Sequence, residues 1–197
     1  EVFMEQATAF LEESRQLLNL MSKRPESDYY RKTQFKSWDI NQVLGHLHIF
    51  NHAADLSLRS STQFEEFFSP IRKALLNGKK LVDTQEEWLD GLSGTRLLDA
   101  WWGEVEKVSS NFSSADPKLR LKWAGPEMSA RSSITARQME TWAHGQEVFD
   151  ILGKTRLEHD RIKNIVHLGV STFHWSFRNR QLDAPADIPN IKLKSPS

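Results

Sequence analysis

Apolar residues recur at helical intervals along most of the chain, and this pattern predicts a protein that is helical almost throughout. The expected helices span residues 2–22, 39–60, 62–77, 95–111, 132–152 and 159–179. The alternation that is typical of a β-strand is missing before residue 185. We therefore predict an all-α protein, a mostly antiparallel four-helix bundle with additional short helices.

Local signals mark several helix ends. Asp39 begins the second helix, and Gln42 three residues later is placed to complete a capping box. Gly78 and Gly153 follow the third helix and the 132–152 helix, and a glycine is a common residue directly after a helix. The stretch SSADPKLRLKWAGPEMS before the 132–152 helix is expected to be a connecting loop.

The last part of the chain differs in character from the rest. Residues 181–197, QLDAPADIPNIKLKSPS, contain three prolines. We expect residues 1–180 to form one helix-bundle domain and residues 181–197 to be a tail, or the start of a further C-terminal domain.

Charge and composition exclude several classes of function. The chain has 26 basic and 26 acidic residues, so it has no general basic field that would collect nucleic acid or an anionic membrane. No segment approaches the roughly 20 apolar residues that span a bilayer, and a cytoplasmic location is expected. Because the 197 residues include no cysteine, a metal must be held by histidine and carboxylate, and thiol chemistry needs a thiol from another molecule.

Three histidines lie on the expected 39–60 helix, and helical geometry separates them. His46 projects from the middle of the apolar stripe, together with Leu47 and Phe50. His48 and His52 fall on the other side and are expected to be solvated. Only His46 is therefore predicted to point into the bundle.

A second ionisable stripe lies on the 132–152 helix, where Glu140, His144 and Glu147 share one narrow face. Apolar residues on several sides indicate that this helix is largely buried, and a buried carboxylate or imidazole is costly unless it is paired or binds a cation. His46, Glu140 and His144 are thus candidate ligands of one divalent metal, and zinc or nickel is expected because imidazole-rich sites suit both ions. A surface Glu–His pair and a hydrogen-bonded core histidine remain the alternatives.

The segments SWDINQVLGHLHIF, KWAGPEMSARSSITARQMETWAHGQEVFDILG and RIKNIVHLGVSTFHWSF carry a resemblance to a known family. Over about residues 1–180 the chain resembles the metal-binding domain of mycothiol-dependent maleylpyruvate isomerases, in an uncharacterised branch of the DinB-like helix-bundle superfamily. The resemblance implies a DinB-like bundle that binds a divalent metal through His46, Glu140 and His144. The family usually has Asp where Glu147 stands.

The resemblance also implies an activity. The metal would activate an exogenous small thiol, mycothiol-like, bacillithiol-like or glutathione-like, for isomerisation or thiol transfer. Glu147 is expected beside the ligands, as a hydrogen-bond partner of an imidazole or as a proton acceptor. A metal-dependent hydrolase that uses water and a non-catalytic metal- or ligand-binding module remain the alternatives. The expected partners are a small-molecule substrate and the thiol, with a homodimer left open.

Three further residues are candidates for substrate binding. Trp123, in WAGPEMS, is expected to border the mouth of the pocket. Arg131 and Arg137 carry the guanidinium fork that suits a substrate carboxylate, although a salt bridge from Arg137 to Glu140 is an equal alternative. His167 and His174 are expected on a solvated face.

Overall fold

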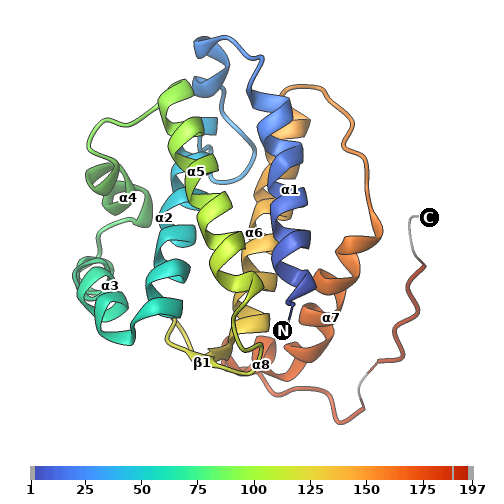
Figure 1. Cartoon of the computed structure of the whole chain (residues 1–197). Helices are drawn as coiled ribbons and strands as arrows, with labels where there is room; N and C mark the ends of the chain where they lie inside the picture. The colour runs from blue at the N-terminus through green and yellow to red at the C-terminus, as the bar shows by residue number, and fades with distance from the viewer. Residues whose placement is uncertain (1–2, 188, 195–197) are drawn as a thin grey trace. The chain divides into compact units, whose positions relative to one another are not determined.

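The structure, a computed structural model, describes residues 3–187 and 189–194. Four long helices form the bundle of its first compact unit, α1 (Glu5–Met21), α2 (Ile40–Arg59), α5 (Gly94–Ser113) and α6 (Ala130–Ile151). Helix α1 packs against α5 and α6, and α2 packs against the same two helices, so the four close into a ring (Figure 1). The predicted all-α bundle is confirmed.

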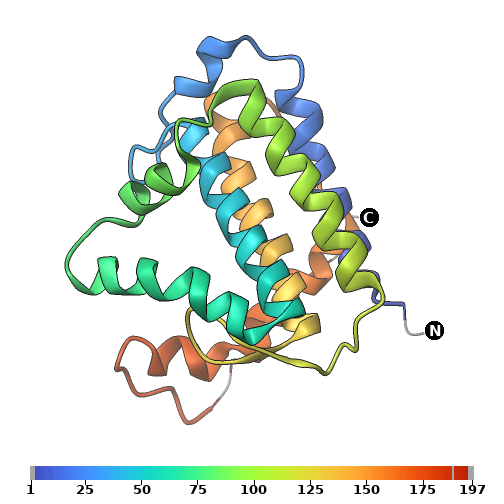
Figure 2. The ribbon, with the colours of Figure 1, turned by 60° about the vertical axis from the view of Figure 1, so that its left-hand side comes forward.

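The four helices run in two directions (Figure 1). Helices α1 and α6 point one way, whereas α2 and α5 point the other. The predicted antiparallel packing therefore holds for α1 with α5 and for α2 with α6, and two parallel pairs complete the ring. The parallel pairs arise because α3 (Ser61–Leu76) and α4 (Leu81–Leu89) return the chain along the bundle, so that α5 begins near the start of α2 (Figure 2).

Apolar side chains from all four long helices fill the centre of the bundle. The largest fully buried ones in this main core are Trp101, Tyr29, Phe10, Phe112, Leu17, Met21, Ile40 and Leu44. Burying each such side chain stabilises the fold by about 1.5–3 kcal/mol relative to exposure. A smaller cluster of Ala53, Phe64 and Phe68 lies where α3 packs on α2.

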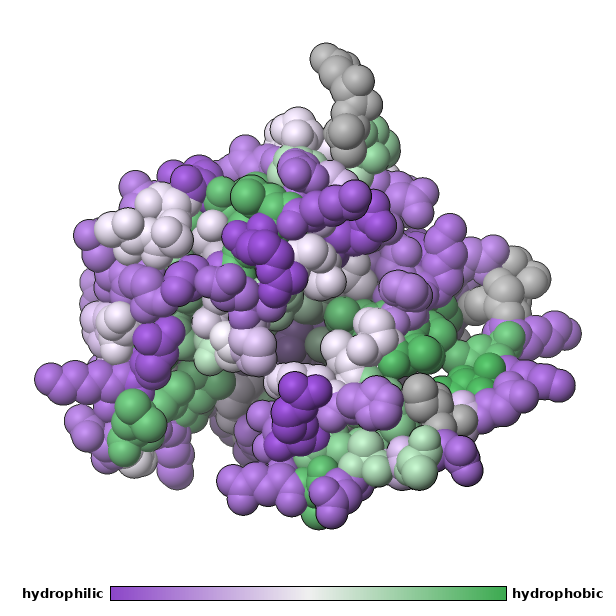
Figure 3. All heavy atoms as spheres, turned by 90° about the horizontal axis from the view of Figure 1, so that it is seen from below, coloured by the Kyte–Doolittle hydropathy of each residue, from purple (hydrophilic) through white to green (hydrophobic). Residues whose placement is uncertain are grey.

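Hydrophilic side chains cover much of the face seen in Figure 3, and apolar groups lie between them, as is usual for a protein surface. Within residues 3–187 and 189–194, none of the helices combines the length and the apolar character that a membrane span needs.

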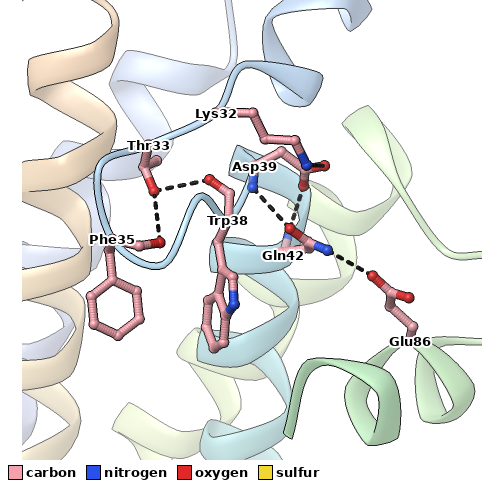
Figure 4. Close-up of polar contacts among 7 residues, drawn as sticks. All are labelled: Lys32, Thr33, Phe35, Trp38, Asp39, Gln42 and Glu86. Carbon is pink, nitrogen blue, oxygen red and sulfur yellow. Dashed lines mark hydrogen bonds and ion pairs between the residues drawn. The ribbon is translucent and has the colours of Figure 1, made fainter. Parts of the chain in front are cut away.

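The predicted helix ends are confirmed. The Asp39 carboxylate accepts a hydrogen bond from the Gln42 backbone N–H, and the Gln42 side chain accepts one from the Asp39 backbone N–H, so both bonds of the capping box are present (Figure 4). Gly78 and Gly153 take φ values of 85° and 63°. Only glycine adopts this left-handed conformation at little cost, which explains why α3 and α6 end there.

The described residues also form elements outside the predicted set. Helix α4 occupies a segment for which no helix was predicted. Two short strands, β1 (Arg120–Leu121) and β2 (Met128–Ser129), pair antiparallel inside the predicted loop. A short helix η1 (Glu26–Tyr30) also joins α1 to the loop before α2.

The helix predicted over residues 159–179 is broken. It consists of η2 (Asp160–Ile162), α7 (Lys163–Ser171) and α8 (Phe173–Arg178). At the break, the hydroxyl groups of Ser171 and Thr172 both donate to the Leu168 carbonyl. Such bonds compete with the helical backbone pattern, and the single-helix prediction is wrong at this point.

The chain divides into two compact units, Glu1–Arg156 and Leu157–Ser197. The predicted domain of residues 1–180 extends beyond the first unit and stays a prediction. The described residues of the predicted tail after residue 181 form no helix or strand. Positions 188 and 195–197 of that tail lie outside the described residues.

Candidate metal centre

Three potential metal ligands meet between α2 and α6. His46 comes from α2, and Glu140 and His144 come from α6, one helical turn apart. One ligand atom from each residue lies within 4.8 Å of the others. The Nε2 atoms of both imidazoles lie 3.2 Å from the same oxygen, Oε2 of Glu140. The structure therefore brings together the three residues that the sequence selected.

The electrostatic environment sets the charge of this cluster. Burial acts to raise the pKa of Glu140, but hydrogen bonds to His144 and His46 outweigh it and hold that pKa well below its ordinary value. Burial lowers the pKa of His46, although the neighbouring Glu140 partly offsets this effect. An ionised carboxylate beside a neutral imidazole is the protonation state that metal binding requires. This donor set of two nitrogens and one oxygen fits a divalent cation such as zinc.

Aromatic rings surround the cluster. The ring centroids of Trp38 and Phe50 lie 5.4 Å and 4.8 Å from that of His46. The centroid of Phe35 lies 4.9 Å from that of His144, in an edge-to-face arrangement. These rings limit the access of water, which strengthens electrostatic interactions at the cluster.

A tight loop before α2 places two of these rings. The Thr33 hydroxyl donates to the carbonyls of Trp38 and Phe35, and the Trp38 backbone N–H donates to the same Phe35 carbonyl. Figure 4 shows the Phe35 and Trp38 side chains projecting from this loop in the same direction. Lys36 and Ser37 at its tip both take positive φ, at 52° and 56°. The loop thus accepts backbone strain of about 1–2 kcal/mol per residue at these two positions.

Helix α4 contributes a residue that the sequence did not reveal. Gln85 is 1% exposed, and its Nε2 lies 2.7 Å from Nδ1 of His46. The ring of His46 is thereby held from both sides, by Gln85 at Nδ1 and by Glu140 at Nε2. The apolar periodicity of Leu81, Val82 and Leu89 could have indicated α4 as a helix, but nothing in the sequence pairs Gln85 with His46.

Arg137 lies on α6 one turn before Glu140 and is 3% exposed. Its guanidinium carbon lies 5.2 Å from the Trp123 ring centroid and 5.7 Å from that of Phe50. Among the described residues, its Nε and Nη1 atoms have no hydrogen-bond partner, and no ion pair joins it to Glu140. Arg137 and Trp123 are thus brought together near the cluster, whereas Arg131 is exposed at the start of α6.

Glu147 is half-buried on α6 and is not a member of the group of potential ligands found among the described residues. The structure therefore gives no support to Glu147 as a direct fourth ligand of the metal. The expected role beside the ligands stays a prediction.

The histidines outside the centre differ from expectation in part. His48 is 8% exposed and its ring centroid lies 5.2 Å from that of Trp88, because α4 covers this face of α2. The prediction that His48 is solvated is therefore wrong. His52 is half-buried, with Nδ1 3.5 Å from a Glu104 oxygen. His167 and His174, in the second unit, are exposed as predicted.

Comparisons with known proteins agree with this architecture. Residues 10–149 match the family model described as the mycothiol maleylpyruvate isomerase N-terminal domain. The uncharacterised proteins MT0041 and Rv0036c, from two strains of Mycobacterium tuberculosis, are each 32% identical over 185 residues, which cover 94% of this chain and 71% of each relative.

Solved structures show the same fold. The crystal structure of a mycothiol-dependent maleylpyruvate isomerase aligns with a TM-score of 0.64 at 11% identity, covering 91% of this chain and 72% of that chain. A variant of that enzyme with one histidine replaced by alanine aligns with a TM-score of 0.63. The predicted DinB-like bundle is confirmed, and the chain belongs to the mycothiol maleylpyruvate isomerase N-terminal domain family.

Proposed function

We propose that this protein is a divalent-metal-dependent enzyme that activates an exogenous small thiol for isomerisation or thiol transfer. The convergence of His46, Glu140 and His144 carries the proposal, because these three residues supply a complete ligand set for a catalytic metal. Membership of a family named for a mycothiol-dependent enzyme supports a mycothiol-related function. Zinc and nickel are the proposed metals, since both accept imidazole ligands readily.

A metal at this centre supplies Lewis-acid chemistry that lowers the pKa of a bound thiol. The residues of the chain prepare the site for that chemistry. Glu140 stays ionised and His46 stays neutral, while Trp38, Phe35 and Phe50 restrict water. The absence of cysteine from these 197 residues agrees with a thiol that comes from another molecule.

We assign Arg137 and Trp123 to the binding of an anionic group of the substrate, and Arg131 to a further contact at the exposed start of α6. A buried guanidinium whose Nε–H and Nη1–H groups lack hydrogen-bond partners is costly, and an anionic group of the substrate would supply acceptors for them. The Phe50 ring lies against both His46 and Arg137, so the anion would bind one side chain away from the centre. Glu147 is proposed to receive the proton released by the thiol.

The test has two stages on protein purified without an affinity tag. Elemental analysis should find close to one equivalent of zinc or nickel in the wild type and much less in His46→Ala, with His167→Ala as the control for an exposed histidine. Equal metal in wild type and His46→Ala would contradict the centre.

The second stage uses cobalt in place of the native metal. Titration with mycothiol, bacillithiol or glutathione should change the visible spectrum of the bound cobalt, because a thiolate ligand adds a charge-transfer band. A spectrum that no thiol alters would contradict thiol activation. Hydrolysis of ester or amide substrates by that same protein would then favour water as the nucleophile.

A further inference from the structure

The side-chain amide of Gln85 has a hydrogen-bond partner at its nitrogen but, among the described residues, none at its oxygen. Its Nε2 lies 2.7 Å from Nδ1 of His46, whereas its Oε1 is buried and has no hydrogen-bond partner among the described residues. We propose that Gln85 is a positioning residue that serves both tautomers of His46, donating to Nδ1 without metal and accepting from Nδ1 when metal is bound. This inference rests on the metal centre proposed above.

Without metal, the contacts of His46 define one tautomer. A neutral imidazole carries a single hydrogen, on one of its two nitrogens. The Gln85 N–H group donates to Nδ1, so the hydrogen lies on Nε2 and is donated to Glu140 at 3.2 Å. Both ring nitrogens are thereby satisfied in a buried position, where an unsatisfied polar group would be costly.

Metal binding reverses these roles. Nε2 is the ring nitrogen of His46 that faces Glu140 and His144, so its lone pair would bind the metal once its hydrogen has left. The hydrogen must then be carried by Nδ1, and the neutral ring still holds one hydrogen in all. Nδ1–H of His46 would then face the N–H₂ group of Gln85, and two hydrogen-bond donors would oppose each other. A half-turn of the amide replaces Nε2 by Oε1, which then accepts from Nδ1–H.

A carboxylate or a backbone carbonyl accepts only, so it would serve just one of the two tautomers. The amide of Gln85 serves both, which suits a centre that must hold His46 in place before the metal arrives. Helix α4 is itself held against α2, because the Gln42 amide donates to Glu86 at 2.8 Å. This contact is made by the exposed side chain of Glu86 and involves neither Gln85 nor His46.

Nitrogen NMR of ¹⁵N-histidine-labelled protein observes the tautomer directly. The His46 signals are identified by their loss in His46→Ala. We expect the hydrogen on Nε2 in the chelator-treated wild type and on Nδ1 after zinc is added. A hydrogen already on Nδ1 of the neutral ring in the metal-free wild type would overturn the proposal.

Three variants separate positioning from simple packing. Gln85→Leu removes both hydrogen bonds and should weaken zinc binding about 10–100-fold, measured by competition with a chromophoric chelator. Gln85→Glu accepts only, so it should restore affinity while placing a hydrogen on Nδ1 in the metal-free protein too. Glu86→Ala, which loosens α4 at a neighbouring residue, should leave both the tautomer and the affinity close to wild type.

The outcomes distinguish this inference from the function on which it rests. A wild type that binds neither zinc nor nickel would overturn both proposals. Wild-type zinc affinity in Gln85→Leu, with metal lost in His46→Ala, would overturn the role of Gln85 alone and leave the centre intact. A purely structural role would weaken Gln85→Leu and Gln85→Glu alike and would not move the hydrogen.

Discussion

Gly45 of α2 packs directly against Leu89 of α4, and a Cβ atom at position 45 would lie 2.6 Å from Leu89 Cδ1. Real Cβ contacts are essentially never this short, and a side chain at position 45 must therefore displace Leu89 or the helix that carries it. Because α4 also carries Gln85, this close approach connects helix packing to the candidate metal centre.

We expect Gly45→Val to lower stability by about 1–3 kcal/mol through overpacking and to weaken zinc binding, because α4 moves away from His46. Adding Leu89→Ala should recover part of both losses, since it removes the atom that clashes. Urea denaturation and chelator competition measure the two effects. Gly103→Val on α5 is the matched control, because a Cβ there meets nothing within 4 Å. Equal losses in the two glycine variants would contradict the role of the Leu89 contact.

Arg137 is expected to lower the stability of the folded protein while it contributes to the binding of a carboxylate. Replacing it by Met keeps most of the apolar contacts with Phe50 and Trp123 and removes a buried charge whose Nε and Nη1 atoms have no hydrogen-bond partner among the described residues. Arg137→Met should therefore raise the free energy of unfolding by about 1–4 kcal/mol and abolish the binding of a small carboxylate probe such as succinate.

Calorimetric titration with succinate and urea denaturation test the two halves of this prediction. Arg131→Met, at an exposed position, should change stability little and is the surface control for the denaturation measurement alone. Succinate binding by Arg137→Met that equals that of the wild type would contradict the proposed subsite, and a lower free energy of unfolding would contradict the predicted cost of the buried charge.

His48 should make stability depend on pH. Burial lowers its pKa from 6.5 to about 4, and the opposing attraction of Glu104 is smaller. Between pH 6.5 and 4 the His48 imidazole is therefore protonated in the unfolded chain but neutral in the folded chain. The free energy of unfolding consequently falls as the pH is lowered over this range, by about 3 kcal/mol at most. His52 and Lys107 also face this imidazole and lower its pKa further.

His48→Gln should flatten this dependence when both chelator-treated proteins are denatured with urea at pH 7, 5.5 and 4.5. His167→Gln, at an exposed position in the second unit, should keep the wild-type slope. Identical slopes for His48→Gln and wild type would show that another group causes the loss.

Glu147→Gln should keep the fold and most of the metal, because Glu147 is not among the three converging residues. If Glu147 accepts the proton of the thiol, its loss should depress turnover about 10–100-fold. The measurement is the pH profile of thiol-dependent turnover, with metal content determined on the same sample. Glu86→Gln serves as the control for the loss of an exposed carboxylate on α4. Unchanged turnover in Glu147→Gln would exclude the residue from the reaction.

Helical periodicity predicted the bundle well because each long helix must bury one apolar stripe, and that requirement is local in sequence. It also selected His46, Glu140 and His144, since each lies on an inward face of its own helix. Arg137 was predicted as a candidate for carboxylate binding. The sequence did not indicate its apolar surroundings, because the rings of Phe50 and Trp123 are brought to the guanidinium by α2 and by the loop before α6.

Other features depend on tertiary contacts that a helical projection does not contain. The projection assigned His48 to solvent because it treated the face opposite the core as uncovered, yet α4 packs there. The same helix was missed because the segment around Gln85 is polar and short. The contact between Gln85 and His46 joins residues 39 positions apart, and no pattern along the chain specifies it.

The contact between His46 and Glu140 joins residues that are 94 positions apart in the chain. Closing so long a loop costs conformational entropy before the contact repays it, so the ligand set should be absent from the unfolded chain and should form late in folding. Metal at 100 times its dissociation constant would then add about 2.7 kcal/mol to stability, because only the folded state binds it. That gain should appear as slower unfolding and leave the rate of folding unchanged. Bound metal would thus retain the folded bundle without directing its formation.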